Sequence, residues 1–238
     1  MDDLRTELET LVNGEDSHER AELREVVEAV LAAGVQSRHA LAARVLDRDA
    51  GVLRDHAYRL LRLMNDDLAQ QTWLALLNDP DPIWRSQAMN GLDLLGRASS
   101  ATALIAVLRA DPVAHVRGHA AIVLGTCAPA SEEALELLLA ILGDATEPPH
   151  IRGSAAEALH RYADVRAANA LVSALEDPEP EVRYYTAFAL AARNDAAALP
   201  ALERAAAIEQ AVLPAPLGPV RDEILASIEH IRYRQRRG

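Results

Sequence analysis

The sequence DPVAHVRGHAAIVL, residues 111–124, decides the fold because copies of it recur along the chain. Close copies are DPDPIWRSQAMNGL at 79–92 and DPEPEVRYYTAFAL at 177–190, and a weaker copy, TEPPHIRGSAAEAL, covers 146–159. The shared pattern is Asp-Pro, then an apolar residue followed by arginine, a small residue three positions later and an aliphatic residue seven positions later. Internal repetition at this period is the signature of a repeat architecture.

Six copies can be recognised when two degenerate ones are included. Their arginines, at intervals of 31, 32, 35, 31 and 38 residues, are Arg54, Arg85, Arg117, Arg152, Arg183 and Arg221. In a helix with 3.6 residues per turn, the apolar, small and aliphatic positions share one face, as Val116, Ala120 and Leu124 do. We expect this face to be buried.

Each copy predicts the second helix of a helical pair. Pairs such as Asp81-Pro82 and Glu179-Pro180 suit a helix start, because proline lacks only an N–H that would have no partner there. Another amphipathic helix precedes each copy, for example SATALIAVLRA at 100–110. Because so small a pair cannot bury its own apolar face, neighbouring pairs must stack. The sequence predicts an all-α, right-handed α-solenoid (α-α superhelix) of about seven stacked helical hairpins.

We expect the pairs to form one continuous domain. The longer intervals predict irregular structure at Gly143 to Pro149 and at Val212 to Pro219. The predicted parts of the domain, which spans residues 1–238, are an N-terminal capping pair at 1–36, repeats at 37–212 and a C-terminal capping helix with a basic tail at 213–238.

Composition supports a helical protein and narrows the choice of partners. Ala (47) and Leu (35) dominate the 238 residues, whereas only eight are aromatic, which favours helix over strand. The 36 acidic residues against 24 Arg, with no Lys, give a net charge of -12, so we expect no nucleic acid partner. There is no apolar run of about 18 residues, so we expect no membrane span. The single cysteine, Cys127, and the acidic start predict a cytoplasmic protein.

The copies quoted above resemble HEAT repeats, in particular the short HEAT-like repeats first associated with phycobilin lyases. The resemblance covers residues 37–232 and is strongest over 67–193. It implies that the second helices line a concave side, and that Asp and Arg of successive units form a hydrogen-bonded ladder. Thr146 replaces the Asp of one unit, so we expect the ladder to be interrupted there. The residues that would form it are Asp79, Arg85, Asp111, Arg117, Arg152, Asp177 and Arg183.

The solvent-facing positions of the second helices define a candidate binding groove. Aromatic residues gather there in one unit, and large aromatics in a groove are typical of binding hot spots. The alternative is that one or two of them pack against neighbouring units, as aromatic side chains usually do. The candidate partner-binding residues are Tyr184, Tyr185, Phe188, His119, His56, Arg59, Gln87, Asn90 and Glu157.

Histidines suggest a metal site only weakly. His115 and His119 are four residues apart, and His150 begins the next equivalent helix, but no convergent Cys or acid accompanies them. Deoxyhypusine hydroxylases are HEAT-like proteins that hold iron through repeated His-Glu pairs. Here the only such pair is His18-Glu19, so that identification fails. We predict no metal and no cofactor.

The two ends of the chain carry opposite charge. Residues 1–33 hold ten acidic residues and three Arg, which is typical of a solvated cap and also suits docking of a basic partner. The C-terminal Arg232, Arg234, Arg236 and Arg237 suit the end of a helix, where cations are stabilising.

No phosphate loop, Gly-x-Ser-x-Gly elbow or Cys-x-x-Cys pair is present in the sequence. We predict that the chain is not an enzyme but an interaction scaffold or adaptor, a monomer or weak dimer that holds a partner protein or peptide in its concave groove. The alternative is a phycobilin-lyase-like or other cofactor-modifying enzyme subunit. A tetrapyrrole would need the aromatic contacts that Tyr184 to Phe188 offer.

Overall fold

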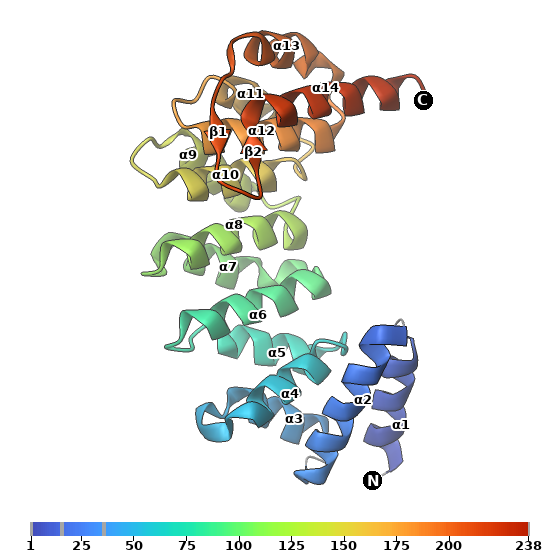
Figure 1. The fold of residues 1–238 in the computed structure, drawn as a ribbon. Helices are drawn as coiled ribbons and strands as arrows, with labels where there is room; N and C mark the ends of the chain where they lie inside the picture. Colours follow the sequence, from blue (N-terminus) through green and yellow to red (C-terminus); the bar gives the residue numbers. More distant parts are fainter. Residues whose placement is uncertain (1, 15–16, 35–36, 238) are drawn as a thin grey trace. The chain divides into compact units, whose positions relative to one another are not determined.

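The computed structural model describes residues 2–14, 17–34 and 37–237. The chain divides into two compact units, Met1–Leu95 (unit 1) and Gly96–Gly238 (unit 2). Within the described residues, fourteen α-helices follow one another as seven pairs (Figure 1). The predicted all-α solenoid class, built from stacked helical hairpins, is therefore confirmed. That the pairs form one continuous domain stays a prediction.

Unit 1 holds three helical pairs. The second helix of the first pair, α2, packs against α4, and the first helices α3 and α5 pack against each other. The six helices are α1 (Asp2–Asn13), α2 (Ser17–Ala32), α3 (Arg38–Leu46), α4 (Val52–Leu61), α5 (Asp67–Leu76) and α6 (Pro82–Leu95).

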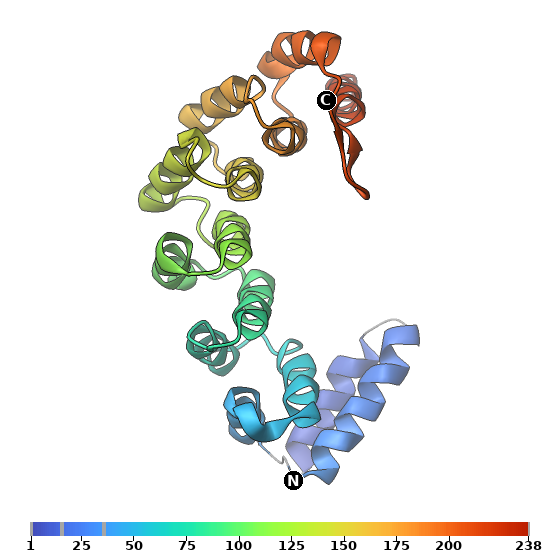
Figure 2. The same cartoon turned by 60° about the vertical axis from the view of Figure 1, so that its left-hand side comes forward.

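Unit 2 holds four pairs in two layers. Its second helices pack side by side in chain order, α8 against α10, α10 against α12, and α12 against α14. Figure 2 shows these second helices along the inner side of the curve of unit 2, with the first helices outside them. The eight helices are α7 (Ala101–Ala110), α8 (Ala114–Cys127), α9 (Glu132–Gly143), α10 (Pro149–Leu159), α11 (Val165–Ala174), α12 (Pro180–Arg193), α13 (Leu199–Ile208) and α14 (Val220–Gln235).

The predicted apolar face of the second helices forms the core. Val116, Ala120 and Leu124 of α8 are all completely buried. Close approach of α8 to α10 requires a glycine on the same helix, because a Cβ on Gly125 would lie 2.9 Å from the carbonyl oxygen of Ala158. Small residues at this seam therefore let neighbouring repeats share one continuous core.

Short non-α elements lie in the connections. The strands β1 (Val212–Leu213) and β2 (Gly218–Pro219) form an antiparallel hairpin in which Val212 pairs with Pro219. This hairpin occupies one of the two predicted irregular segments. The 3₁₀ helices of the described residues are η1 (Arg48–Ala50), η2 (Ala98–Ser100) and η3 (Ala196–Ala198).

The turns of the three Asp-Pro copies share one construction. A carboxylate oxygen of the turn aspartate accepts a hydrogen bond from the backbone N–H two residues later, at 2.9 Å in each case. This arrangement mimics a backbone turn and leaves the second carboxylate oxygen for another donor. The three pairs are Asp79 with Asp81, Asp111 with Val113, and Asp177 with Glu179.

An arginine of one repeat links the turn before its own helix to the turn of the next repeat. Arg183 donates to the backbone carbonyl of Asp177, in the turn before its own helix, at 2.7 Å. It also donates to the carboxylate of Glu209, after the next first helix, at 2.9 Å. The carboxylate of Asp177 in turn pairs with Arg152 of the preceding repeat. We call this series of links the arginine ladder.

The arginine ladder extends beyond the residues that the resemblance suggested. In unit 1, Arg54 pairs with Asp79, and both side chains are buried. Burial alone would raise the pKa of Asp79, but hydrogen bonds from Arg54 and from the Asp81 amide lower it below its ordinary value. Arg85 is also buried and donates to the carbonyl of Asp79 at 2.9 Å.

At the position of the expected interruption, a neighbouring residue receives the arginine. Thr146 bonds to the carboxylate of Asp144, and an oxygen of Glu147 lies 3.5 Å from Nη2 of Arg117. Arg117 also donates to the carbonyl of Asp111 at 3.0 Å. The longer Glu side chain thus provides the carboxylate in this turn.

We predict that Arg152→Met destabilises the protein by about 3 kcal/mol, because removing one partner leaves the carboxylate of Asp177 without its buried cation. The matched control is Arg109→Met, since Arg109 forms an exposed ion pair with Glu133 that contributes at most about 1 kcal/mol. Urea denaturation followed by circular dichroism measures both. Equal, small losses in the two variants would show that the arginine ladder does not hold the repeats together.

Candidate functional site

The predicted partner-binding residues fall into two sets. His119, Glu157, Tyr184, Tyr185 and Phe188 lie on second helices of unit 2. The remaining four, on α4 and α6 of unit 1, are His56, Arg59, Gln87 and Asn90. Each set is described within its own unit, so a single groove formed by both stays a prediction.

Three aromatic residues on α12, Tyr184, Tyr185 and Phe188, form what we call the aromatic patch. Phe188 is 41% exposed, whereas the two tyrosines are half-buried. The tyrosine rings meet edge to face, with centroids 5.4 Å apart. Phe188 meets the ring of His160 edge to face at 6.3 Å. Phe188 is therefore the member of the patch that offers most surface to a partner.

Tyr185 has a packing role as well. A Cβ on Gly153 of α10 would lie 2.8 Å from the Cδ2 atom of Tyr185, so the ring rests on the backbone of the neighbouring repeat. The packing alternative therefore holds for Tyr185, which lies between neighbouring repeats. That the exposed Phe188 binds a partner stays a prediction.

A cavity of about 340 Å³ adjoins the aromatic patch between α12 and α14. We call it the α12–α14 trough. Ser227 of α14 donates to the carbonyl of Ala187 at 3.0 Å and so holds the two helices together beside it. The small alanine side chains that line the trough leave room for an apolar side chain next to Phe188. The trough is lined by Phe188, Ala191, Ala192, Glu223, Ala226, Ser227 and His230.

Carboxylates surround the aromatic patch. Burial, and after it the charges of Glu157 and Glu181, raise the pKa of Tyr185. The pKa of Tyr184 is raised by burial and then by the charge of Glu223, with which its hydroxyl forms a hydrogen bond. Glu157, Glu181 and Glu223 come from α10, α12 and α14, so three successive second helices each place one carboxylate at the patch.

Three of the four unit 1 candidates have partners within their own unit. Arg59 pairs with Glu22 of α2 at 3.2 Å, and Asn90 donates to Gln87 at 3.3 Å. His56 is half-buried on α4.

Sequence reasoning missed an aromatic cluster in unit 1. Tyr58 meets Trp73 and Trp84 edge to face at 5.4 and 5.9 Å, and the guanidinium of Arg54 lies 3.9 Å from the ring centre of Trp84. Trp84 occupies the apolar position before the repeat arginine, where we expected burial. It is only half-buried, and its ring covers the guanidinium of the ladder residue Arg54.

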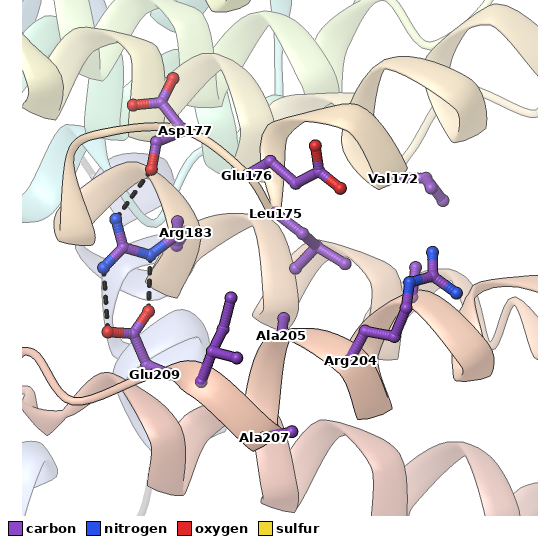
Figure 3. Close-up of a pocket in the computed structure, with 11 residues that line it drawn as sticks. Val172, Leu175, Glu176, Asp177, Arg183, Arg204, Ala205, Ala207 and Glu209 are labelled. Carbon is purple, nitrogen blue, oxygen red and sulfur yellow. Dashed lines mark hydrogen bonds and ion pairs between the residues drawn. The ribbon is translucent and has the colours of Figure 1, made fainter.

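A second cavity, of about 740 Å³, lies between α11 and α13 (Figure 3). Leu175 and Ala205 face each other across it, and the Arg183–Glu209 pair of the arginine ladder closes one end. Ile208 lies on its wall and is 79% exposed. Apart from Arg183 of α12 and the turn residues 175–177 and 209, the residues that line this α11–α13 cavity lie on first helices, and none belongs to the aromatic patch. Its charged pair already serves the ladder.

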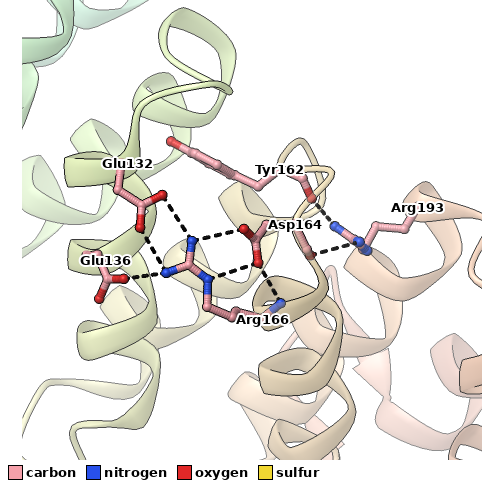
Figure 4. Close-up of polar contacts among 6 residues, drawn as sticks. All are labelled: Glu132, Glu136, Tyr162, Asp164, Arg166 and Arg193. Atoms are coloured by element: carbon pink, nitrogen blue, oxygen red, sulfur yellow. Dashed lines mark hydrogen bonds and ion pairs between the residues drawn. The ribbon is translucent and has the colours of Figure 1, made fainter.

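An exposed network shows how other carboxylates of unit 2 are paired (Figure 4). Arg166 of α11 donates to Glu132 and to Glu136 of α9, and also to Asp164. The hydrogen bonds from Arg166 lower the pKa of Asp164 to about 2. Arg193 lies beside this network and donates to the backbone carbonyls of Tyr162 and Asp164. These contacts join neighbouring repeats at the outer surface.

The predicted histidine pair stands without further ligands. Among the described residues, no group of three or more His, Cys, Asp or Glu side chains could hold a metal ion. His115 is exposed on α8, and His119 is half-buried one turn later. The side chains of His18 and Glu19 lie outside the described residues.

At the C-terminus, Arg232 pairs with Glu203 of α13, and Arg237 lies 5.0 Å from the ring centre of Tyr233.

Through the described part of the chain, no helix combines the length and the apolar character that a membrane crossing needs.

Comparison with protein families gives one match. The family described as HEAT repeats matches residues 69–159 and 101–178. These ranges contain the copies at 79–92, 111–124 and 146–159 and the first two residues of the copy at 177–190. No curated protein matches the chain.

Solved structures of three kinds resemble the chain at low identity. The complex of CpcE and CpcF of phycocyanin lyase from a Nostoc species is 18% identical over 93% of this chain and 92% of that chain, with a TM-score of 0.48. Human deoxyhypusine hydroxylase in complex with glycerol is 19% identical over 96% and 97%, with a TM-score of 0.36. A designed armadillo repeat protein is 17% identical over 80% and 98%, with a TM-score of 0.43. These TM-scores are too low to indicate what this chain does.

We predict that Glu157→Gln stabilises the protein at neutral pH. Burial raises the pKa of Glu157, although the charge of Arg161 opposes this. A raised pKa in the folded state means that the ionised carboxylate costs stability, and that this cost disappears as the pH falls through the folded pKa. The urea midpoint of the variant should exceed that of the parent near pH 7 and approach it below the ordinary glutamate value of about 4.3.

The control for this prediction is Glu176→Gln, at an exposed residue of a turn. The difference in urea midpoint between this variant and the parent should not change with pH. A titration of the Glu157 carboxyl by NMR measures its pKa directly. A value at or below the ordinary one would contradict the interpretation.

Proposed function

Because this chain is a HEAT-like repeat protein, we propose that it is a non-enzymatic interaction scaffold that binds a partner protein or peptide on the second helices of unit 2. The observation that carries the proposal is the exposed ring of Phe188 beside the α12–α14 trough. An aromatic side chain at the edge of an apolar cavity is what interface anchors require. The predicted cytoplasmic location and the monomer or weak dimer belong to the same proposal.

Preorganisation is the mechanism that supports binding there. The arginine ladder and the apolar seams hold α10, α12 and α14 in place without a partner. Both lie on faces of these helices other than the one that carries the aromatic patch. Binding then need not order the scaffold, so a few anchors can supply the affinity. Phe188 loses little conformational freedom, since its ring already rests against His160.

We predict that Phe188→Glu weakens partner binding roughly 30-fold. The tagged chain captures partners from a lysate of its source organism, mass spectrometry identifies them, and binding is then measured with the purified partner. Loss of one hot spot of about 2 kcal/mol weakens binding roughly 30-fold. The matched control is Ile208→Glu, which puts the same charge on the wall of the α11–α13 cavity and should change binding less than about twofold.

Three outcomes would contradict the proposal. Loss of binding in Ile208→Glu but not in Phe188→Glu would move the site to the α11–α13 cavity. A partner whose affinity neither variant changes would exclude both surfaces. An absorbance shift on mixing the parent chain with a bilin, lost in Phe188→Glu, would favour the cofactor-modifying alternative.

A further inference from the structure

Two of the carboxylates at the aromatic patch lack the partners that other acidic residues have. Within the described part of the chain, the carboxylates of Glu157 and Glu181 form neither a hydrogen bond nor an ion pair. Elsewhere in unit 2, Glu209 pairs with a ladder arginine, and Glu132 and Glu136 pair with Arg166. Exposed carboxylates such as Glu176 and Glu229 also have no ion pair among the described residues, but water solvates them, whereas Glu157 and Glu181 are half-buried beside the exposed aromatic surface.

The positive groups near the patch do not neutralise these carboxylates. Arg161 acts on Glu157 through its charge but lies too far away for an ion pair, and it is exposed. Burial lowers the pKa of His160, which favours its neutral form. Arg193 donates to backbone carbonyls of the preceding turn. His230 is exposed on the far wall of the α12–α14 trough.

Aromatic rings and carboxylates together select for a cation. A guanidinium or ammonium is attracted by the ring faces and forms charge-assisted hydrogen bonds with carboxylates. Burial raises the pKa of Glu157, so this carboxylate is partly removed from water without a compensating charge. A cation from outside would supply that compensation. The net charge of -12 attracts basic partners over longer distances.

We propose that the partner carries a basic segment whose arginine or lysine side chain binds over the aromatic patch, between Glu157, Glu181 and Glu223. This inference rests on the proposed function and specifies its partner. The cation lies against Tyr185 and Phe188, where three helices place their carboxylates. A neighbouring aliphatic side chain of the same segment occupies the α12–α14 trough. Both contacts meet at Phe188, so the recognised element is a short stretch that combines basic and aliphatic residues.

Selection from a random peptide library displayed on phage tests the inference with the full chain as bait. We expect the enriched peptides to carry Arg or Lys beside an aliphatic residue, and to lose binding to Phe188→Ala. The double variant Glu157→Gln/Glu181→Gln should not enrich basic peptides. The matched control is Glu25→Gln/Glu176→Gln, which removes the same charge from exposed residues that do not belong to the patch and should keep the preference.

An enriched peptide is then measured by fluorescence anisotropy against a copy in which citrulline, a neutral analogue, replaces its arginine. We expect the citrulline peptide to bind the parent chain at least tenfold more weakly. We also expect Glu157→Gln/Glu181→Gln to bind the two peptides with affinities within twofold of each other.

The outcomes separate this inference from the function on which it rests. Enriched peptides that depend on Phe188 but lack basic residues would overturn the inference and leave the scaffold function standing. Basic peptides that bind both double variants equally would overturn it too, because attraction would then come from net charge alone. A library that yields no peptide for the parent chain would count against peptide binding itself, and the inference would fall with it.

Discussion

An arginine that reaches from the turn before its own helix to the turn of the next repeat connects successive helical pairs. Arg183 does this between Asp177 and Glu209, and Arg152 pairs with the carboxylate of the same Asp177. Hydrophobic stacking alone is not directional and would not set the register of one pair on the next. Charge-assisted hydrogen bonds have strict geometry, so the arginine ladder specifies how far each repeat is shifted from its neighbour. Removing one partner of a buried pair is costly because the other charge is then left buried and unpaired, so each link of the ladder depends on both of its residues.

This arrangement determines which surface a partner can use. The ladder occupies the turns, and the aliphatic positions of each second helix occupy the seams between repeats. One face of α10, α12 and α14 takes part in neither, so side chains there can vary without destabilising the packing of the repeats. The aromatic patch and its carboxylates lie on that face. Even so, Tyr185 rests on Gly153, so packing and binding share α12.

The sequence predicted those parts of the fold that repeat. Six copies of one pattern determine helix ends and buried faces, and the completely buried Val116, Ala120 and Leu124 follow from spacing alone. The sequence could not predict which residue replaces the turn aspartate as the partner of a ladder arginine where the pattern is not matched. Glu147 receives Arg117 beside the position where an aspartate was missing, because its longer side chain reaches from a backbone position that spacing does not reveal. Glu209 receives Arg183 from the regular position, 32 residues after Asp177, and accepts from the backbone N–H two residues later as the turn aspartates do, so only its residue type departs from the pattern.

The candidate site shows the same division between local pattern and tertiary contact. The aromatic residues of α12 stand out in the sequence because they lie one turn apart. Their surroundings depend on which carboxylates neighbouring helices bring near, and on which of these already have a cation. The sequence places Glu157 on a second helix and Glu132 on a first helix, but it does not reveal that Arg166 pairs with Glu132 while Glu157 stays unpaired at the patch. Since paired carboxylates are satisfied by the fold, it is the unpaired ones beside exposed aromatic surface that determine the chemistry of a partner.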